Sequence, residues 1–391
     1  MSTAAPAAPP RAGRVRAPRV PMGTQRLLAV GFVLLAIVLP FFFDAGGDVM
    51  DNLVLAAAYA VMALGLNIIV GFAGLLDLGY VAFFAIGAFA MGYGGSRFLS
   101  DVADVHIFVS GQAANLPGIH LNFLLILVLA IALTTAAGML IGLPTLRLRG
   151  DYIAIVTLAF GEIIGRIAIN GDEIRIGGFQ LTGGRQGITP VDKVDLPLIE
   201  RFSSLNLRPW YWLAIALFLL VLFVNFRLRD SRLGRAWIAL REDEVAAASM
   251  GVPLVKTKLL AYGTGAAFGG MSGAFLASYL NTVNADQFRF SFSIFILAMV
   301  ILGGLGSIWG VVLGAVVLSG INFYLIPRVL GPVFQDLFNF DLTALSFGIF
   351  GFLLVIMMVL RPEGLLPERR RQIEMAGDET ADDAVYETRM A

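Results

Sequence analysis

The sequence predicts an all-α protein, a polytopic transmembrane helix bundle of about ten spans. Two observations predict this fold class. Hydrophobic residues make up 58% of the 391 residues and charged residues only 14%, whereas charged residues make up about 25% of a typical soluble protein. Long apolar stretches also recur along the chain. Lipid offers the backbone no hydrogen-bond partners, so we expect these stretches to be helices, since β-barrel strands would alternate in polarity.

The spans are expected where apolar stretches approach the roughly 20 residues that a helix needs to cross a bilayer. One of them, 291–303, is short and ends in glycine, and another, 75–98, carries Asp77 near its start. The expected spans are 27–43, 53–72, 75–98, 121–146, 151–169, 210–226, 257–280, 291–303, 308–326 and 341–360.

The distribution of Lys and Arg predicts that both chain termini are cytoplasmic (N-in/C-in), because basic residues in short loops favour the cytoplasmic side. The loop 227–256 is basic and is therefore placed inside, whereas 170–209 becomes an extracytoplasmic loop. The expected organisation is a disordered basic N-terminal tail (1–26), a transmembrane domain (27–366) and a cytoplasmic C-terminal tail (367–391).

The composition argues against several classes of protein. The chain has no cysteine and only two histidines, so it offers no thiolate metal site and no basis for a His-containing triad. Its 28 basic and 28 acidic residues balance, which gives no electrostatic reason to expect a nucleic acid as partner. It lacks the G-x-x-x-x-G-K-[ST] loop that binds ATP phosphates. We therefore expect no enzyme activity and no metal or cofactor in this chain, and any ATP used to be bound by another protein.

The cytoplasmic segment 232–251 has the pattern of a helix with a sharp end. Gly251 suits a left-handed position after the last turn and Pro253 prevents continuation, so a second helix is expected from about Leu254. Small residues leave a smooth face that is suited to docking in a groove of a partner. The alternative is a connector helix lying along the membrane. Trp237, Leu240, Glu244 and Ala247 are expected to share one face, and Arg241, Glu242, Asp243 and Glu244 to form a polar rim.

The segment 71–80 is a candidate for lining a path through the bundle. Its glycines, among them Gly74 and Gly79, favour a break between two helices that exposes backbone groups to a cavity. Asp77 lies in this break. Its carboxylate could bind an ammonium group of a solute, or it could cap the following helix or form a structural ion pair.

Glu162 and Arg166 are the other ionisable residues expected inside a span. They are spaced i, i+4, in the order that favours an ion pair. Unpaired charges are costly in lipid, so both are expected to face the bundle interior. They are expected to form an internal pair, or alternatively to serve a translocation pathway.

A glycine-rich run, LTGGRQGI (181–188), lies in the extracytoplasmic loop and contains Thr182, Gly183 and Gly184. Its glycines allow tight turns that leave backbone N–H groups open. On pattern alone it is either a turn-rich loop or part of the outer opening of a path.

Several of these runs together resemble a known family. The run REDEVAAASMGV (241–252) resembles the EAA loop of ABC-importer permeases, which docks on the ATPase, with Ala246, Ala247 and Gly251 in place and Glu244 one residue early. The wider match is to the LivM-type permeases of branched-chain amino acid or urea-type importers. The matching runs are GFAGLLDLGYVAFFAIGAFA (71–90), LPTLRLRGDYIAIVTLAFGEI (143–163), LTGGRQGI (181–188), LGRAWIALREDE (233–244), ILGGLGSIWGVVLGA (301–315) and RPEGLL (361–366).

This resemblance implies a multi-pass permease subunit in a bacterial plasma (inner) membrane, carrying leucine, isoleucine and valine. It implies a second homologous permease, two cytoplasmic ATP-binding subunits and an extracytoplasmic solute-binding protein as partners. The implied ATPase-coupling residues are Arg241, Glu242, Asp243, Glu244, Ala246, Ala247 and Gly251. Urea or a short amide is an alternative solute, and a self-contained secondary transporter or channel is the alternative function.

Overall fold

The computed structural model describes residues 36–109, 116–146, 148, 150–176, 179–195, 202–338, 345–361 and 363–366. The chain divides into two compact units, Met1–Phe42 and Phe43–Ala391. The described part of the first unit contains the short 3-10 helix η1 (Leu39–Phe41). The tails expected at 1–26 and 367–391, and most of the expected span 27–43, lie outside the described residues.

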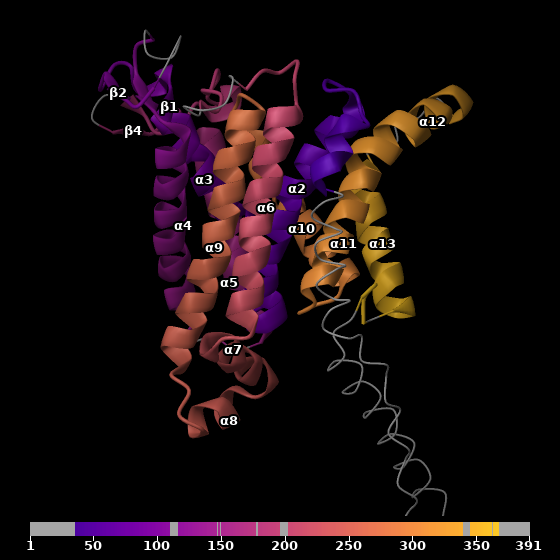
Figure 1. Ribbon diagram of the computed structural model, residues 1–391. Coiled ribbons are helices and arrows are strands. Elements are labelled where there is room, and N and C mark those ends of the chain that lie inside the picture. The colour runs from indigo at the N-terminus through magenta and orange to yellow at the C-terminus, as the bar shows by residue number, and fades with distance from the viewer. Residues whose placement is uncertain are drawn as a thin grey trace, which may run out of the picture. The chain divides into compact units, whose positions relative to one another are not determined.

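The second unit is a bundle of roughly parallel and antiparallel helices (Figure 1). Every expected span from 53–72 onward coincides with one of them. Two short helices, α7 (Arg232–Glu242) and α8 (Glu244–Ser249), lie at one end of the bundle, which we call the loop end. The long helices are α2 (Asp48–Leu66) with π-helical η2 (Asn67–Phe72), α3 (Val81–Gly94), α4 (Phe123–Thr145), α5 (Asp151–Asn170), α6 (Arg208–Arg229), α9 (Leu254–Tyr279), α10 (Phe290–Gly303), α11 (Ile308–Gly320) with π-helical η7 (Ile321–Leu330) and α12 (Gly331–Phe338), and α13 (Ser346–Leu360).

Five helices in the described residues are long and apolar enough to cross a membrane: Asp48–Phe72, Phe123–Thr145, Tyr152–Asn170, Arg208–Arg229 and Ile308–Phe334. Three shorter apolar helices lie beside them, Val81–Gly94, Phe290–Gly303 and Gly348–Met357. The chain is therefore mostly helical with several candidate spans, as expected. The count of ten and the N-in/C-in orientation stay predictions.

Helix α9 forms the centre of the bundle and packs against α2, α3 and α4. Its packing depends on small residues. A Cβ at Gly265 would lie 2.9 Å from the carbonyl oxygen of Gly65, and one at Gly273 would overlap the backbone of Phe84. Small residues let helix backbones approach closely where lipid gives no hydrophobic drive for association. The Tyr80 hydroxyl donates to the carbonyl of Gly265 (2.8 Å), which joins the start of α3 to this core.

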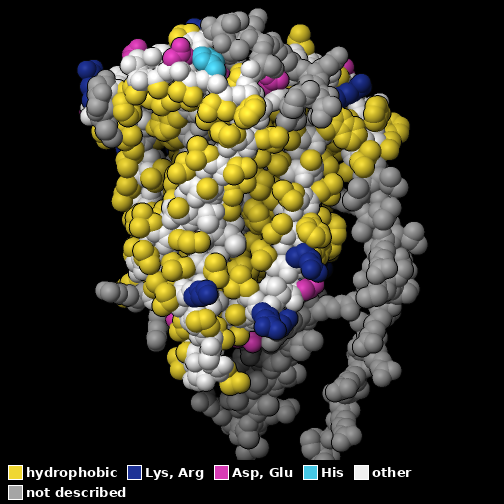
Figure 2. Space-filling model, turned by 60° about the vertical axis from the view of Figure 1, so that its left-hand side comes forward, with side chains coloured by type: hydrophobic (Ala, Val, Ile, Leu, Met, Phe, Trp, Pro, Cys, Tyr) yellow, Lys and Arg dark blue, Asp and Glu magenta, His cyan; other side chains and the backbone are white. Residues whose placement is uncertain are grey.

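The outer surface carries the apolar side chains that a membrane requires. Leu124, Val128, Leu133 and Leu140 of α4 are all exposed. Figure 2 shows hydrophobic side chains over the middle of one face, with Lys, Arg and acidic side chains gathered toward its two ends. This distribution is the one expected of a bundle whose middle contacts lipid tails.

Short strands, which depart from the predicted all-α fold, occupy the end opposite the loop end (Figure 1). Strand β3 (Ile119–Leu121) lies between β1 (Gly95–Ser96), to which it is antiparallel, and β2 (Val105–Ile107), to which it is parallel. A separate antiparallel pair joins β4 (Arg175–Ile176) and β5 (Phe179–Gln180). The 3-10 helices η3 (Arg97–Leu99), η5 (Gly184–Gln186) and η6 (Ala285–Phe288) complete the elements.

Candidate functional site

The segment 232–251 is two helices, not the single helix expected. Helix α7 ends at Glu242, and Asp243 is extended, with φ −155° and ψ 113°. Its carboxylate accepts hydrogen bonds from the amides of Val245 (2.8 Å) and Ala246 (3.0 Å) and so caps α8. These bonds stabilise the charged form and lower the pKa of Asp243. Capping by Asp243 is the physical reason for the break.

The sharp end of this segment is confirmed. Gly251 has φ +84°, a left-handed conformation that side chains rarely adopt. Pro253 follows, and α9 begins at Leu254. The turn at Gly251 therefore sends the chain from α8 back into the bundle.

The four residues expected to share one face lie on two helices: Trp237 and Leu240 of α7 and Ala247 of α8 are buried in the chain itself, while Glu244 is 26% exposed. The indole N–H of Trp237 donates to the carbonyl of Thr257 in α9 (2.9 Å). These buried side chains anchor α7 and α8 to the bundle, so Ala247, which was expected among the ATPase-coupling residues, is not on the exposed surface of α8. The exposed side chains of α8 and its end are different ones: Val245, Ala246, Ala248, Ser249 and Met250.

The expected polar rim is also divided by the structure. The guanidinium of Arg241 donates to the carbonyl of Gly71 (2.6 Å), and Glu244 pairs with Lys258 (2.7 Å). Both side chains therefore make their polar contacts within this chain. Glu242 and Asp243 are exposed. The expectation of one continuous rim was wrong, because the helix break at Asp243 turns neighbouring side chains in different directions.

The helix break expected at 71–80 is confirmed and lies against α7. Helix α2 passes into the π-helical η2, and no regular helix resumes before Val81. Gly74 has φ +69°, and a Cβ there would overlap the side chain of Arg241. The break therefore closes tightly around the arginine, which comes from a segment 170 residues away in the sequence.

The far side of the same break contacts α5. The amide of Leu78 donates to the Thr157 hydroxyl (3.0 Å), and a Cβ at Gly79 would overlap the Thr157 carbonyl. Asp77 is buried, and its carboxylate accepts from the amide of Gly79 (2.8 Å). Asp77 thus braces the turn itself. It does not cap α3, whose N-cap residue, Tyr80, makes no side-chain cap hydrogen bond.

Glu162 and Arg166 lie in the middle of α5 but do not pair. No ion pair in the described residues joins them, and Glu162 is half-buried while Arg166 is exposed. The expected internal pair was wrong. The packed side of α5 is occupied by small residues such as Thr157, Gly161 and Gly165. Arg166 therefore lies on the opposite stripe, with Tyr152, Ile155 and Ile163, all exposed.

The loop residues Thr182, Gly183 and Gly184 lie at the other end of α5. The hydroxyl of Thr182 donates to the carbonyl of Ala168 (3.0 Å) and accepts from the amide of Gly184 (3.2 Å). Two of the expected path segments therefore contact α5, the helix that carries Glu162 and Arg166, which the sequence did not indicate. The break contacts α5 at Thr157 and Gly161, and the loop at Thr182 contacts it at Ala168, near its far end.

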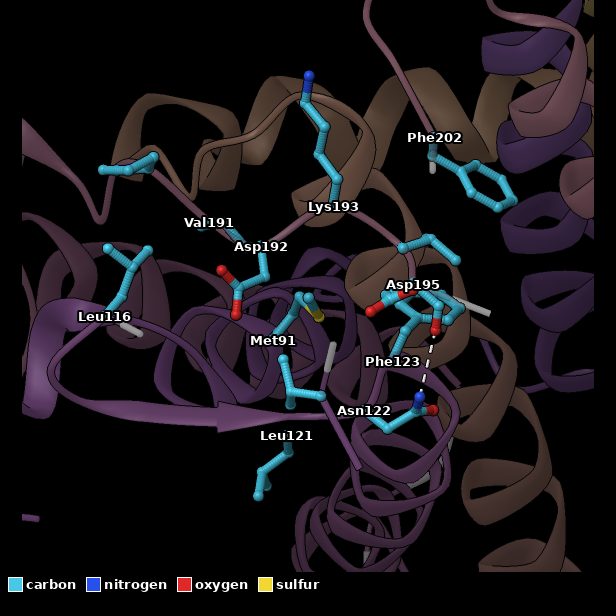
Figure 3. A pocket seen from close by; sticks show the side chains of 13 residues that line it. Met91, Leu116, Leu121, Asn122, Phe123, Val191, Asp192, Lys193, Asp195 and Phe202 are labelled. Atoms are coloured by element: carbon cyan, nitrogen blue, oxygen red, sulfur yellow. Dashed lines mark hydrogen bonds between the residues drawn. The ribbon is translucent and has the colours of Figure 1, made fainter. Parts of the chain in front are cut away.

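A cavity of about 330 Å³ that no sequence pattern predicted lies beside the short strands (Figure 3). Asp192 is central to its wall: its carboxylate lies 2.5 Å from Nδ1 of His120, and its amide donates to the carbonyl of Gly95 (2.7 Å). In Figure 3, Lys193 points away from the apolar side chains, and its ammonium donates to Ser204 (2.6 Å). The lining residues are Met91, Val109, Leu116, Leu121, Asn122, Phe123, Pro190, Val191, Asp192, Lys193, Val194, Asp195 and Phe202.

None of the expected path residues lines this cavity. Among the described residues there is also no group of three or more His, Asp or Glu side chains that could hold a metal ion. The sequence signal that could have indicated this region is its two histidines: the rings of His106 in β2 and His120 in β3 stack with centroids 5.4 Å apart.

Comparison with known proteins identifies the family. Residues 49–359 match the family model described as "Branched-chain amino acid transport system / permease component". This chain belongs to that permease family. The matched residues run from the first turn of α2 to the last turn of α13 and contain α5, the 71–80 break and the α7–α8 segment.

Relatives of the permease carry the same description. It is 36% identical to the high-affinity branched-chain amino acid transport system permease protein LivM of Salmonella typhimurium and 37% identical to that of Escherichia coli K12. Both alignments cover 90% of this chain and 77% of the relative. The permease is also 28% identical to E. coli LivH, a second permease protein of that system, over 43% of this chain and 50% of LivH. No solved structure gives a significant match.

Proposed function

We propose that this chain is one membrane subunit of an ATP-driven (ABC-type) importer of leucine, isoleucine and valine. Membership in the permease family and the names of the LivM relatives support the substrate class. The observation that carries the ATP-driven mechanism is the α7–α8 segment, which lies at one end of the bundle with an apolar tip (Figure 1).

The proposed ATPase-docking surface consists of the exposed residues of α8 and its end: Val245, Ala246, Ala248, Ser249, Met250 and Gly251. Val245 is 60% exposed and Met250 is 85% exposed. Apolar side chains on a short helix are anchors of the kind that insert into a groove of a partner. The exposed Glu242 and Asp243 would lie at the edge of this surface. Arg241, Glu244 and Ala247 support it from inside the chain.

The proposed translocation path follows the exposed stripe of α5. A charged side chain on the outside of a span is costly in lipid, so Arg166 is expected to face a hydrated path or a second protein. Glu162 lies one turn away and can attract an ammonium group, as Arg166 can attract a carboxylate. On the same stripe as Arg166, Ile155 and Ile163 offer apolar contact to an aliphatic side chain. This combination suits a zwitterionic aliphatic amino acid better than urea or a short amide.

The remaining features of the proposal concern partners and orientation. The second permease would be a homologous, LivH-like chain that faces the α5 stripe across the path. Two ATP-binding subunits would dock at the loop end, on the cytoplasmic side of a bacterial plasma membrane, and a solute-binding protein at the other end, beside Thr182, Gly183 and Gly184. The fold would have ten spans with both termini inside. ATP is held by the partners, and this chain performs no chemical reaction.

Uptake into proteoliposomes tests the proposal. The complete complex is expected to accumulate leucine when ATP is supplied on the side of the ATP-binding subunits, and not to accumulate urea. This chain alone is expected to accumulate neither. ATP-independent leucine uptake by this chain alone would show a self-contained transporter and would contradict the proposed function.

A further inference from the structure

The side chain of Arg241 links the α7–α8 segment to a distant part of the bundle. It is half-buried, and its guanidinium donates to the carbonyl of Gly71 (2.6 Å). The chain around Gly74 encloses its aliphatic part, since a Cβ at Gly74 would also lie 3.0 Å from Cβ of Arg241. The arginine is therefore held both at its tip and along its length by the 71–80 break.

The other contacts of α7 and α8 lead elsewhere. Trp237 bonds to Thr257, and Glu244 pairs with Lys258, so both contacts join the segment to the first turns of α9, which follow it directly in the chain. Helix α9 is the buried centre of the bundle. It is a rigid support, because displacing it would disturb its packing against three other helices.

The break passes the contact on to α5. Leu78 donates its amide to Thr157, Gly79 lies against the carbonyl of Thr157, and a Cβ at Gly161 would lie 3.0 Å from the Cα of Gly79. Beyond the break, the amide of Val81 donates to the hydroxyl of Ser293 (3.0 Å), which fixes the start of α3 to α10. The break is thus irregular backbone held between α7 on one side and α5 on the other.

Helix α5 is less tightly packed than α9 and can therefore be displaced more easily. One of its stripes is packed within this chain and the other is exposed, whereas α9 is mostly buried from Ala261 to Ser278. A displacement that reaches both helices is therefore expected to move α5 more than α9. Transmission between two sites requires an element that adopts discrete conformations, with populations that both sites influence. A helix break of irregular backbone can supply such an element.

We propose that Arg241 is a positioning residue that transmits displacement of the α7–α8 segment through the Gly71–Gly79 break to α5. This inference rests on the proposed function, since it requires the segment to be moved by a nucleotide-binding partner. It assigns Arg241 to transmission within this chain, and it assigns Thr157, which was not among the expected site residues, to the same link.

The absence of cysteine from the sequence allows a direct test. Ile163→Cys places one thiol on the exposed stripe of α5. Its reaction rate with a water-soluble maleimide is measured in the complete complex, without nucleotide and with a non-hydrolysable ATP analogue. With Arg241 present, the nucleotide is expected to change the rate at least about fivefold, the lower end of typical coupling between sites. Adding Arg241→Met, which keeps the aliphatic chain and removes the guanidinium, is expected to reduce the change below about twofold.

A matched control is Arg235→Met on the same helix. The guanidinium of Arg235 also donates to a backbone carbonyl, that of Asp230 (2.9 Å), but at an exposed site away from the break. This variant is expected to keep the full nucleotide response. Thr157→Val keeps the shape of the side chain and removes the acceptor for Leu78, so it is expected to reduce the response from the other end of the link. If Arg241→Met fails to assemble with its partners, Thr157→Val still tests the inference.

The outcomes separate this inference from the proposed function. Co-purified ATP-binding subunits with an unchanged nucleotide response in both Arg241→Met and Thr157→Val would overturn the inference and leave the proposed function intact. The absence of any response at Ile163→Cys with Arg241 present would also overturn it. A chain that imports leucine without ATP-binding subunits would overturn the proposed function and this inference with it.

Discussion

Lys258 near the start of α9 pairs with Glu244 at the start of α8, with the ammonium nitrogen 2.7 Å from the carboxylate oxygen. The lysine side chain is only 3% exposed, whereas the glutamate is 26% exposed. The pair therefore fixes α8 to the bundle through a lysine ammonium group that is almost completely buried.

This pairing gives the first prediction. Glu244→Ala leaves the Lys258 ammonium buried without its partner and is expected to destabilise the chain by about 3 kcal/mol. The double variant Glu244→Ala/Lys258→Met removes the stranded charge and is expected to recover most of that loss. Thermal unfolding of the purified chain in detergent measures both. Equal destabilisation by the single and double variants would show that the unpaired charge of Lys258 does not cause the loss of stability.

The second prediction separates strain from charge at Gly251. Its φ of +84° disfavours any side chain, although a Cβ there would meet no atom within 4 Å. Gly251→Ala is therefore expected to cost about 1 kcal/mol through backbone strain and to keep partner binding. Gly251→Asp adds a charge to the proposed docking surface and is expected to weaken association with the ATP-binding subunits at least about tenfold. Equal association of the two variants would argue against docking at this position.

A third prediction follows from the separation of Glu162 and Arg166. Because the structure has no ion pair between them, the stability effects of Glu162→Ala and Arg166→Ala are expected to add within about 0.5 kcal/mol, the upper end of the coupling between charges spaced i, i+4 on a helix surface. Leucine uptake by the complete complex is expected to fall in both single variants, since each removes one proposed contact to the zwitterion. A coupling well above that value in the double-mutant cycle would restore the pair that the spacing suggested.

The fourth prediction concerns the cap of α8. The amides of Val245 and Ala246 lower the pKa of Asp243. A carboxyl with a lowered pKa in the folded state stabilises it above the unfolded pKa of about 3.9 and loses this effect as the pH falls through the folded value. The cap is thus expected to be complete at neutral pH and to weaken only below about pH 4. Asp243→Asn keeps an acceptor and removes the titration.

Hydrogen exchange at the Val245 and Ala246 amides, corrected for the intrinsic effect of pH, measures this cap. Protection is expected to fall in acid in the unaltered chain and to stay constant in Asp243→Asn. The same acid-dependent loss in both proteins would place the titrating group elsewhere.

The sequence predicts most of the bundle because each long helix carries its own signal in a continuous apolar run. The stop at Gly251 and Pro253 was predictable for the same reason, since it depends only on the backbone preferences of neighbouring residues. The short strands were not predictable: β1 has two residues and β2 and β3 have three each, too few to show any alternation.

The candidate site was predictable only in part. The break at 71–80 and the sharp end of the segment 232–251 could be inferred locally, but the contact between Arg241 and Gly71 joins positions 170 residues apart, and no local spacing encodes it. The same applies to Thr157 against Gly79. For Glu162 and Arg166, helical spacing allowed a pair, but spacing alone does not determine which side of α5 packs against the bundle.

Photo-cross-linking from Met250 tests the central claim most directly, namely that the α7–α8 segment faces the ATP-binding subunits. A photoreactive amino acid at Met250, 85% exposed at the loop end, is compared with one at Phe108, equally exposed beside β2 at the opposite end. The account predicts cross-links from position 250 to an ATP-binding subunit and none from position 108. Cross-links to that subunit from position 108, with none from position 250, would contradict it.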